Sequence, residues 1–292
     1  MKKFFTLFIC LLSSATVTSQ VSDWAEIEKV FGRKGTVQGE VFKIAFPRAD
    51  LKVNVGDVMI EPALALTSWI AFKKTESHTM IMGDLVLLDR EIAPVTAKLV
   101  ANEIAITALH NHIVGESPSV MYMHFGGHGD AKALADKMKA ALALTATPMT
   151  LPPAAATATE LDWSKVETTL GRSGQRKGNV LQIGIPRAEK IVDNGMEVPP
   201  FMGMATAINL QMVGEKAATT GDFVLLANEV NPVVKALTEN GIAVTAIHNH
   251  MLFESPRLFF LHFWGFEAPE KLAAGLKTAL DKTGAANAVK NQ

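Results

Sequence analysis

The chain has 292 residues, 48% of them hydrophobic, and its 28 Lys and Arg residues nearly balance its 29 Asp and Glu residues. This length and apolar content allow about two domains with large cores. The near-neutral charge, without any Lys/Arg run, excludes nucleic-acid binding driven by charge, so no nucleic-acid partner is expected.

The first residues have the pattern of a secretory signal peptide. A positive start at Lys2 and Lys3 precedes an apolar stretch, and Val17 and Ser19 form a plausible cleavage pair. The stretch is shorter than the ~20 residues that a membrane span requires. We therefore predict a signal peptide over residues 1–19, no membrane span, and a periplasmic or secreted protein.

Cys10 is the only cysteine, and it lies within this segment. Ile9 precedes it where a lipoprotein signal has a small residue, so a lipid anchor is not expected. The mature chain would then have neither a disulfide nor a thiolate. Any metal must be bound by His and carboxylate side chains.

Two copies of one α+β unit are expected after the signal peptide. Motifs recur at an offset of 139 or 138 residues, and a Pro/Ala/Thr-rich linker separates the copies. Each copy is predicted to be a mainly antiparallel sheet with packed helices. The predicted boundaries are 21–146 for the first copy, 147–158 for the linker and 159–284 for the second copy.

The first copy shows its elements through hydrophobic periodicity and helix-start signals. We predict, in chain order, a helix from Trp24, strands at 41–46, 63–72 and 79–88, a helix at 91–100, strands at 104–110 and 120–125, and a helix at 131–144. The second copy repeats this order, with later helices at 233–239 and 270–283.

The most informative pattern is the repeated sequence IAITALHNHIVGESPSVMYMHFGG and IAVTAIHNHMLFESPRLFFLHFWG. Each copy has His-Asn-His, a Glu after three intervening residues, and a third His after eleven intervening residues. Because residues two apart on a strand face the same side, a hairpin would bring the three imidazoles together. The repeated positions are His110, His112, Glu116 and His124, and His248, His250, Glu254 and His262.

Three imidazoles and a nearby carboxylate suit Zn²⁺ or another first-row divalent metal, with one position open for water or substrate. A lone His on an apolar strand is usually structural, but identical spacing in two diverged copies favours ligands. We predict one site in each copy. Whether Glu116 and Glu254 bind the metal or transfer protons stays open. The positions that correspond to His78 and His128 in the second copy hold Lys216 and Phe266, so these two histidines are expected to be surface residues.

Three arginines are candidates for binding a carboxylate or phosphate group of a small-molecule substrate: Arg48, Arg187 and Arg257. For the first two, an ion pair with Asp50 or Glu189 is the simpler interpretation.

Two further acidic pairs recur in the copies. Glu91 and Glu229 lie at helix starts, where a carboxylate is favourable, and the alternative role is a fourth metal ligand. Asp84 and Asp222 follow a glycine within an apolar run, which favours a bulge or turn.

The motifs GDLVLL and GDFVLL, TALHNH and TAIHNH, and ESP resemble the LppY/LpqO family of secreted bacterial proteins. The likeness covers both copies and implies no assigned activity. Named members are lipoproteins, from which Ile9-Cys10 departs, and Ser119 replaces the Arg that the family pattern favours.

A looser resemblance links the His spacing to the zinc site of acetolactate decarboxylase and of a zinc ester hydrolase with that fold. It implies the six repeated histidines as zinc ligands. The metal would polarise a carbonyl or lower the pKa of bound water to ~7, and Glu254 or Glu116 would move the proton. The opening of the first cupin motif also matches, but cupins are all-β and place their last His much further downstream.

The leading prediction is a secreted metalloenzyme, a hydrolase or lyase acting on a small carbonyl compound or ester. The alternatives are a non-catalytic periplasmic protein that binds a metal or small ligand, and structural zinc in each hairpin. The sequence does not set the oligomeric state, nor whether the copies share one cleft.

Overall fold

The computed structural model describes residues 24–150 and 161–285. The predicted signal peptide and most of the predicted linker lie outside these residues. Each repeat forms one six-stranded sheet in which all neighbouring strands are antiparallel. The predicted α+β class, with two tandem and mainly antiparallel sheets, is therefore confirmed.

The first sheet has the strand order β1-β2-β5-β6-β9-β7. Its elements are β1 (Thr36–Gln38), β2 (Val41–Pro47), β5 (Thr67–Lys74), β6 (Thr79–Leu88), β9 (Val120–Gly129) and β7 (Ala105–His110), with helices α1 (Trp24–Phe31), α2 (Asp89–Ala101) and α3 (Ala131–Leu142).

The second sheet repeats this order as β10-β11-β14-β15-β18-β16. Its elements are β10 (Gln175–Lys177), β11 (Val180–Pro186), β14 (Ala205–Val213), β15 (Lys216–Leu225), β18 (Phe259–Glu267) and β16 (Ala243–His248), with α4 (Ser164–Leu170), α5 (Ala227–Glu239), α6 (Pro269–Leu280) and the 3₁₀ helix η2 (Pro200–Met202).

Two small sheets that the sequence did not predict lie beside the loops with the ESP motifs. They are β4 (Val58–Ile60), β3 (Val53–Val55) and β8 (Glu116–Ser117), and β13 (Met196–Glu197), β12 (Val192–Asp193) and β17 (Glu254–Ser255). The strand predicted at 63–72 begins only at Thr67, because main-chain hydrogen bonds to Glu61 and Pro62 hold residues 61–66 in turns.

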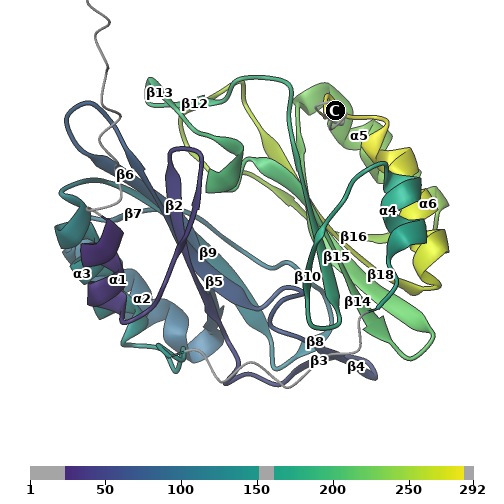
Figure 1. Ribbon diagram of the computed structural model, residues 1–292, viewed down its shortest axis with the longest axis horizontal. Helices are drawn as coiled ribbons and strands as arrows, with labels where there is room; N and C mark the ends of the chain where they lie inside the picture. Colours follow the sequence, from purple (N-terminus) through teal and green to yellow (C-terminus); the bar gives the residue numbers. More distant parts are fainter. Residues whose placement is uncertain (1–23, 151–160, 286–292) are drawn as a thin grey trace, which may run out of the picture.

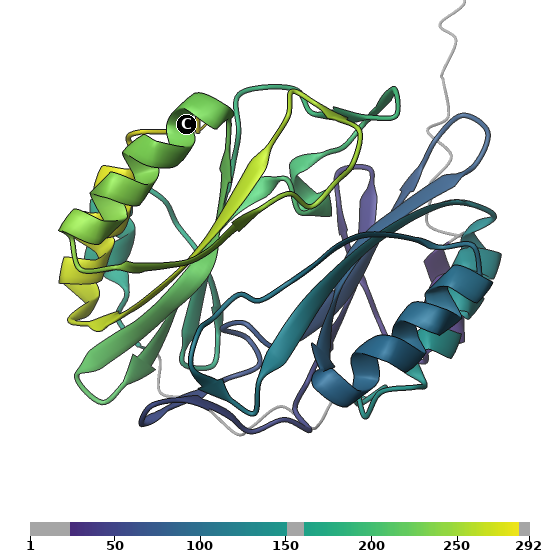
Figure 2. The same ribbon diagram turned by 180° about the vertical axis from the view of Figure 1, so that it is seen from behind.

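The two sheets face each other, and the helices cover their outer faces (Figures 1 and 2). Each repeat has its own core between sheet and helices. Strand β6 is buried along its whole length, since one face contacts the helices and the other faces the second repeat. None of the helices in the described residues is long and apolar enough to cross a membrane.

Two further apolar clusters join the repeats across the space between the sheets. One contains Val41 and Met82 of the first repeat with Val224 and Phe260 of the second. The other contains Val86 and Tyr122 with Val180 and Ala218. Because both clusters draw side chains from both repeats, burial of apolar area holds the two sheets together.

Candidate metal centre

The first histidine of each motif ends an edge strand, and the third lies on the neighbouring strand. His110 is the last residue of β7 and pairs with Tyr122, while His124 of β9 pairs with Ala108. The hairpin therefore places His124 diagonally beside His110 on one face. The second repeat has the same register, with His248 opposite Phe260 and His262 opposite Ala246.

The two sets of histidines meet between the sheets in one six-histidine centre. The rings form three stacked pairs, each with one ring from each repeat. Their centroid distances are 3.6 Å for His110–His248, 3.8 Å for His112–His262 and 3.7 Å for His124–His250. Exchanging the repeats maps these pairs onto one another, so an approximate two-fold axis passes between His110 and His248.

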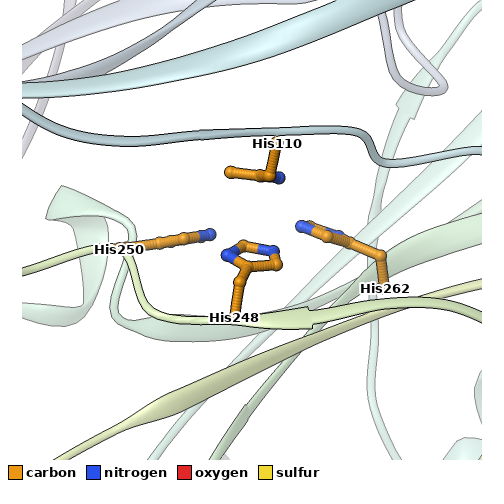
Figure 3. A group of neighbouring side chains, drawn as sticks. All are labelled: His110, His248, His250 and His262. Atoms are coloured by element: carbon orange, nitrogen blue, oxygen red, sulfur yellow. The ribbon is translucent and has the colours of Figure 1, made fainter.

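Two groups of rings have their ligand nitrogens within 4.8 Å of one another. One contains His110 with His248, His250 and His262, and the other contains His110, His112 and His124. Figure 3 shows the four rings of the larger group around one central space, with nitrogens of His250 and His262 directed into it. Histidine groups that could hold a metal ion are thus present, and His110 belongs to both.

Hydrogen bonds fix which ring nitrogen can bind a metal. The Nδ1 atoms of His110, His248 and His262 lie 3.1, 3.3 and 2.7 Å from the carbonyl oxygens of Asn111, Asn249 and Gly221. A carbonyl can only accept, so each Nδ1 carries the proton and each Nε2 keeps its lone pair. Among the described residues, the buried Nε2 atoms of all six centre histidines lack a hydrogen-bond partner.

Burial keeps the imidazoles neutral. It lowers the pKa of His110 to about 3, with a further contribution from His248, and the pKa of His248 to about 4. Burial and the neighbouring imidazoles lower the pKa of the other four well below the ordinary value. Neutral imidazole is the form that binds metal ions.

Two carboxylates whose sequence pattern favoured a bulge or turn, Asp84 and Asp222, lie at the centre. Asp84 pairs with His124 in the unbroken ladder of β6 and β9, and Asp222 pairs with His262. The expectation of a bulge was therefore wrong. The available signal was an Asp kept in both copies within an otherwise apolar strand.

The electrostatic environment of these carboxylates is unusual. Asp84 is 4% exposed, and burial raises its pKa to about 7 although the ammonium group of Lys43 opposes this shift. Burial, with a contribution from Asp84, raises the pKa of Asp222 well above its ordinary value. At Asp84, burial thus outweighs the positive charge of Lys43, and at Asp222 no positive charge offsets the burial.

The two glutamates of the motifs lie in the small sheets. The Glu254 carboxylate accepts hydrogen bonds from the Leu258 amide at 3.1 Å and from Arg257 Nη1 at 3.2 Å. The Glu116 carboxylate lies 3.5 Å from the Val120 amide. Within the described residues, the two groups that could hold a metal ion consist of histidines alone, so neither glutamate belongs to them, and nor do Asp84 and Asp222. Their contacts brace the loop between the hairpin strands.

The three candidate arginines are not brought to the histidines. Arg48 is fully buried and donates to Asp50, Glu91 and the Val86 carbonyl. Arg187 makes the equivalent contacts in the second repeat, with Glu189, Glu229 and the Val224 carbonyl. We call each of these buried ion-pair clusters a hub. Arg257 contacts Glu254 and the loop carbonyls, with half of its side chain exposed.

Glu91 and Glu229 cap their helices and also form the ion pairs of these hubs. Glu91 accepts from the Leu88 amide at 2.9 Å, and Glu229 accepts from the Leu226 amide at 2.7 Å. The capping interpretation is thus confirmed for both. His78 and His128 form an edge-to-face pair with centroids 5.2 Å apart, with His128 exposed and His78 half-buried.

A family model described as Domain of Unknown Function (DUF1259) matches residues 25–144 and 164–282. The chain belongs to this family. The two matches confirm a tandem repeat, and the family description gives no activity.

No curated protein matches the chain. Among solved structures, the chain is similar to a trimeric bacterial microcompartment shell protein, PduB, with 10% identity over 86% of this chain and 93% of that chain. The TM-score is 0.20, so this likeness implies neither a shared fold nor a shared assembly.

Proposed function

We propose that the protein binds a first-row divalent metal, with zinc as the leading candidate, in the six-histidine centre between its repeats. The observation that carries this proposal is the set of six buried Nε2 atoms without hydrogen-bond partners among the described residues. A buried polar atom normally has a partner, so a set of unpartnered nitrogens gathered in two neighbouring groups indicates ligands that accept their lone pairs.

The tautomers and burial support the same proposal. Main-chain carbonyls orient three of the rings through Nδ1, as second-shell acceptors commonly do for histidines bound to metals. When bound, the metal would supply a Lewis acid that the chain itself lacks. Nitrogen ligands favour zinc or another borderline metal over Mg²⁺ or Ca²⁺.

The position of the centre favours binding over catalysis. Two surface cavities, of about 250 Å³ beside Arg187 and about 580 Å³ beside His78, contain none of the centre histidines. His262 is completely buried and His250 is 5% exposed, while His112 and His248 are half-buried. A metal held at this depth would primarily join the repeats or store the ion.

A hydrolase or lyase acting on a small carbonyl compound or ester is the second candidate. It is favoured by Lys43 and Asp84, which are electrostatic neighbours, because burial moves the pKa of both groups to about 7. Groups with such pKa values suit general acid–base chemistry. The likeness to acetolactate decarboxylase stays a prediction, as do export to the periplasm and the LppY/LpqO assignment.

The test is metal content by inductively coupled plasma mass spectrometry on chain purified without a metal-affinity tag. We expect stoichiometric zinc, and strong loss in a His250→Ala variant but not in a His78→Ala variant. Absence of bound metal after incubation with zinc would refute the proposal. A screen for ester hydrolysis and decarboxylation, with Lys43→Met as the comparison, then separates enzyme from binding protein.

A further inference from the structure

Asp84 and Asp222 are buried carboxylates without the partners that burial normally requires. The side chains are 6% and 17% exposed, and Oδ1 of each has no hydrogen-bond partner within the described residues. Leaving a carboxylate unpaired in a protein interior is strongly unfavourable. A positively charged ligand beside each carboxylate would remove this cost.

The distances to the histidines suit a shared ion and exclude hydrogen bonds. Oδ2 of Asp84 lies 3.9 Å from His112 Nε2 and 4.0 Å from His124 Nε2, and Oδ2 of Asp222 lies 3.8 Å from His250 Nε2. These separations are too long for hydrogen bonds. An ion ~2.1 Å from each of two such atoms fits between them at a wide angle.

The arrangement occurs once in each repeat, and the sheet register produces it both times. The central strand places its Asp directly opposite the third His of the motif, so carboxylate and imidazole share the face turned toward the other repeat. Gly83 and Gly221 precede these carboxylates. A Cβ at Gly221 would lie 1.9 Å from the Ala207 carbonyl oxygen, so the close strand approach beside Asp222 requires glycine.

We propose that Asp84 and Asp222 are metal ligands, each binding one of two ions beside the histidines nearest to it, Asp84 with His112 and His124 and Asp222 with His250. This inference rests on the proposed metal-binding function. Each carboxylate neutralises one of the two charges of a divalent ion, and six neutral imidazoles cannot do so. The carboxylates thereby lower the cost of placing the ions between the sheets.

The proposed ion sites at Asp84 and Asp222, here called the two half-sites, differ in one neighbouring charge. Lys43 is an electrostatic neighbour of Asp84, and its ammonium group lies 3.6 Å from the centroid of the Trp69 ring. The corresponding residue of the second repeat is Gln182, which donates to the Ala63 carbonyl. A nearby ammonium group repels a metal ion, so the Asp84 half-site binds its ion more weakly than the Asp222 half-site.

The test is titration of the metal-free full chain with Co²⁺, followed by visible absorption, and with Zn²⁺, followed by calorimetry. We expect two Co²⁺ ions to bind wild type. Asp84→Asn and Asp222→Asn should each lower the affinity for one Co²⁺ ion by at least ~10-fold and alter the absorption spectrum of that ion. The control is Asp136→Asn, which changes an exposed Asp paired with Lys132 and should leave both ions unaffected.

Lys43→Gln provides a second variant that leaves the carboxylates in place. It should raise the affinity for the more weakly bound ion several-fold. Unchanged affinities and spectra in both Asn variants would overturn this inference, while wild-type binding would leave the proposed function intact. If an Asn variant does not fold, unchanged affinity in Lys43→Gln overturns the inference. Wild-type protein that binds neither metal would overturn both proposals.

Discussion

The imidazole rings of His110 and His248 are stacked with their centroids 3.6 Å apart, although 138 residues separate them in the chain. Neither repeat alone can form this contact. The pair lies on the approximate two-fold axis, so the centre belongs to the interface between the repeats.

His110 is predicted to bind an ion in one of the two groups that contain it. It is the one residue that belongs to both groups of ligand nitrogens, whereas His112 and His124 belong to one. The Nδ1 of His110 is protonated, so its single free lone pair, on Nε2, can bind only one ion, and we expect His110→Ala to weaken one equivalent of zinc, as measured by mass spectrometry after dialysis. Unchanged binding of both equivalents would show that His110 is not a ligand.

Metal removal should destabilise the whole molecule, because the centre joins both sheets. A ligand bound only by the folded state adds ~2.7 kcal/mol at a free concentration of 100 times Kd. For a chain of this size we expect zinc to raise Tm by about 5–10 °C over EDTA-treated protein. The measurement is calorimetry with and without EDTA. A His112→Ala/His250→Ala double variant is the control and should show little shift.

The glycine before Asp222 offers a test of how the strands position the carboxylate. Gly221→Ala would place a Cβ against the Ala207 carbonyl and the Phe263 ring, forcing β14 and β15 apart. Overpacking of this kind costs ~1–3 kcal/mol. We expect lower stability in urea and weaker metal binding.

Gly184→Ala is the matched control, because no atom lies within 4 Å of its added Cβ. It lies on β11, where Gly184 pairs with Ala207 itself. Alanine is more favourable than glycine in a strand interior, so this variant should be neutral or slightly stabilised. Equal destabilisation of both variants would show that the contact at Gly221 has no special role.

The sequence predicted the local parts of the site because local spacing determines them. Two histidines separated by one residue share a strand face, and a short hairpin returns the third beside them. The same reasoning predicted the helix capping by Glu91 and Glu229.

Packing between the repeats could not be predicted in this way. Spacing within one hairpin carries no information about which sheet faces meet, so stacking of His112 on His262 was not foreseen. Asp84 was missed for a related reason. Its role depends on the register of β6 against β9, and these strands are far apart in sequence.

The last prediction concerns the buried hub around Arg48 and its dependence on pH. Burial alone would raise the pKa of Glu91, but hydrogen bonds from Arg48 and from the Leu88 amide outweigh it and lower the pKa below its ordinary value of 4.5. Glu91 therefore stabilises the folded state above pH 4.5, and this contribution is lost as the pH falls through the folded-state pKa.

Glu91→Gln should accordingly destabilise the protein at pH 7 by up to ~3 kcal/mol, because Arg48 keeps only Asp50 as a carboxylate partner. The difference from wild type should shrink as the pH is lowered below 4.5, since protonated Glu91 resembles Gln. Urea unfolding between pH 3 and pH 7 measures this. A difference that stays constant over this range would mean that packing, rather than the charge on Glu91, stabilises the hub.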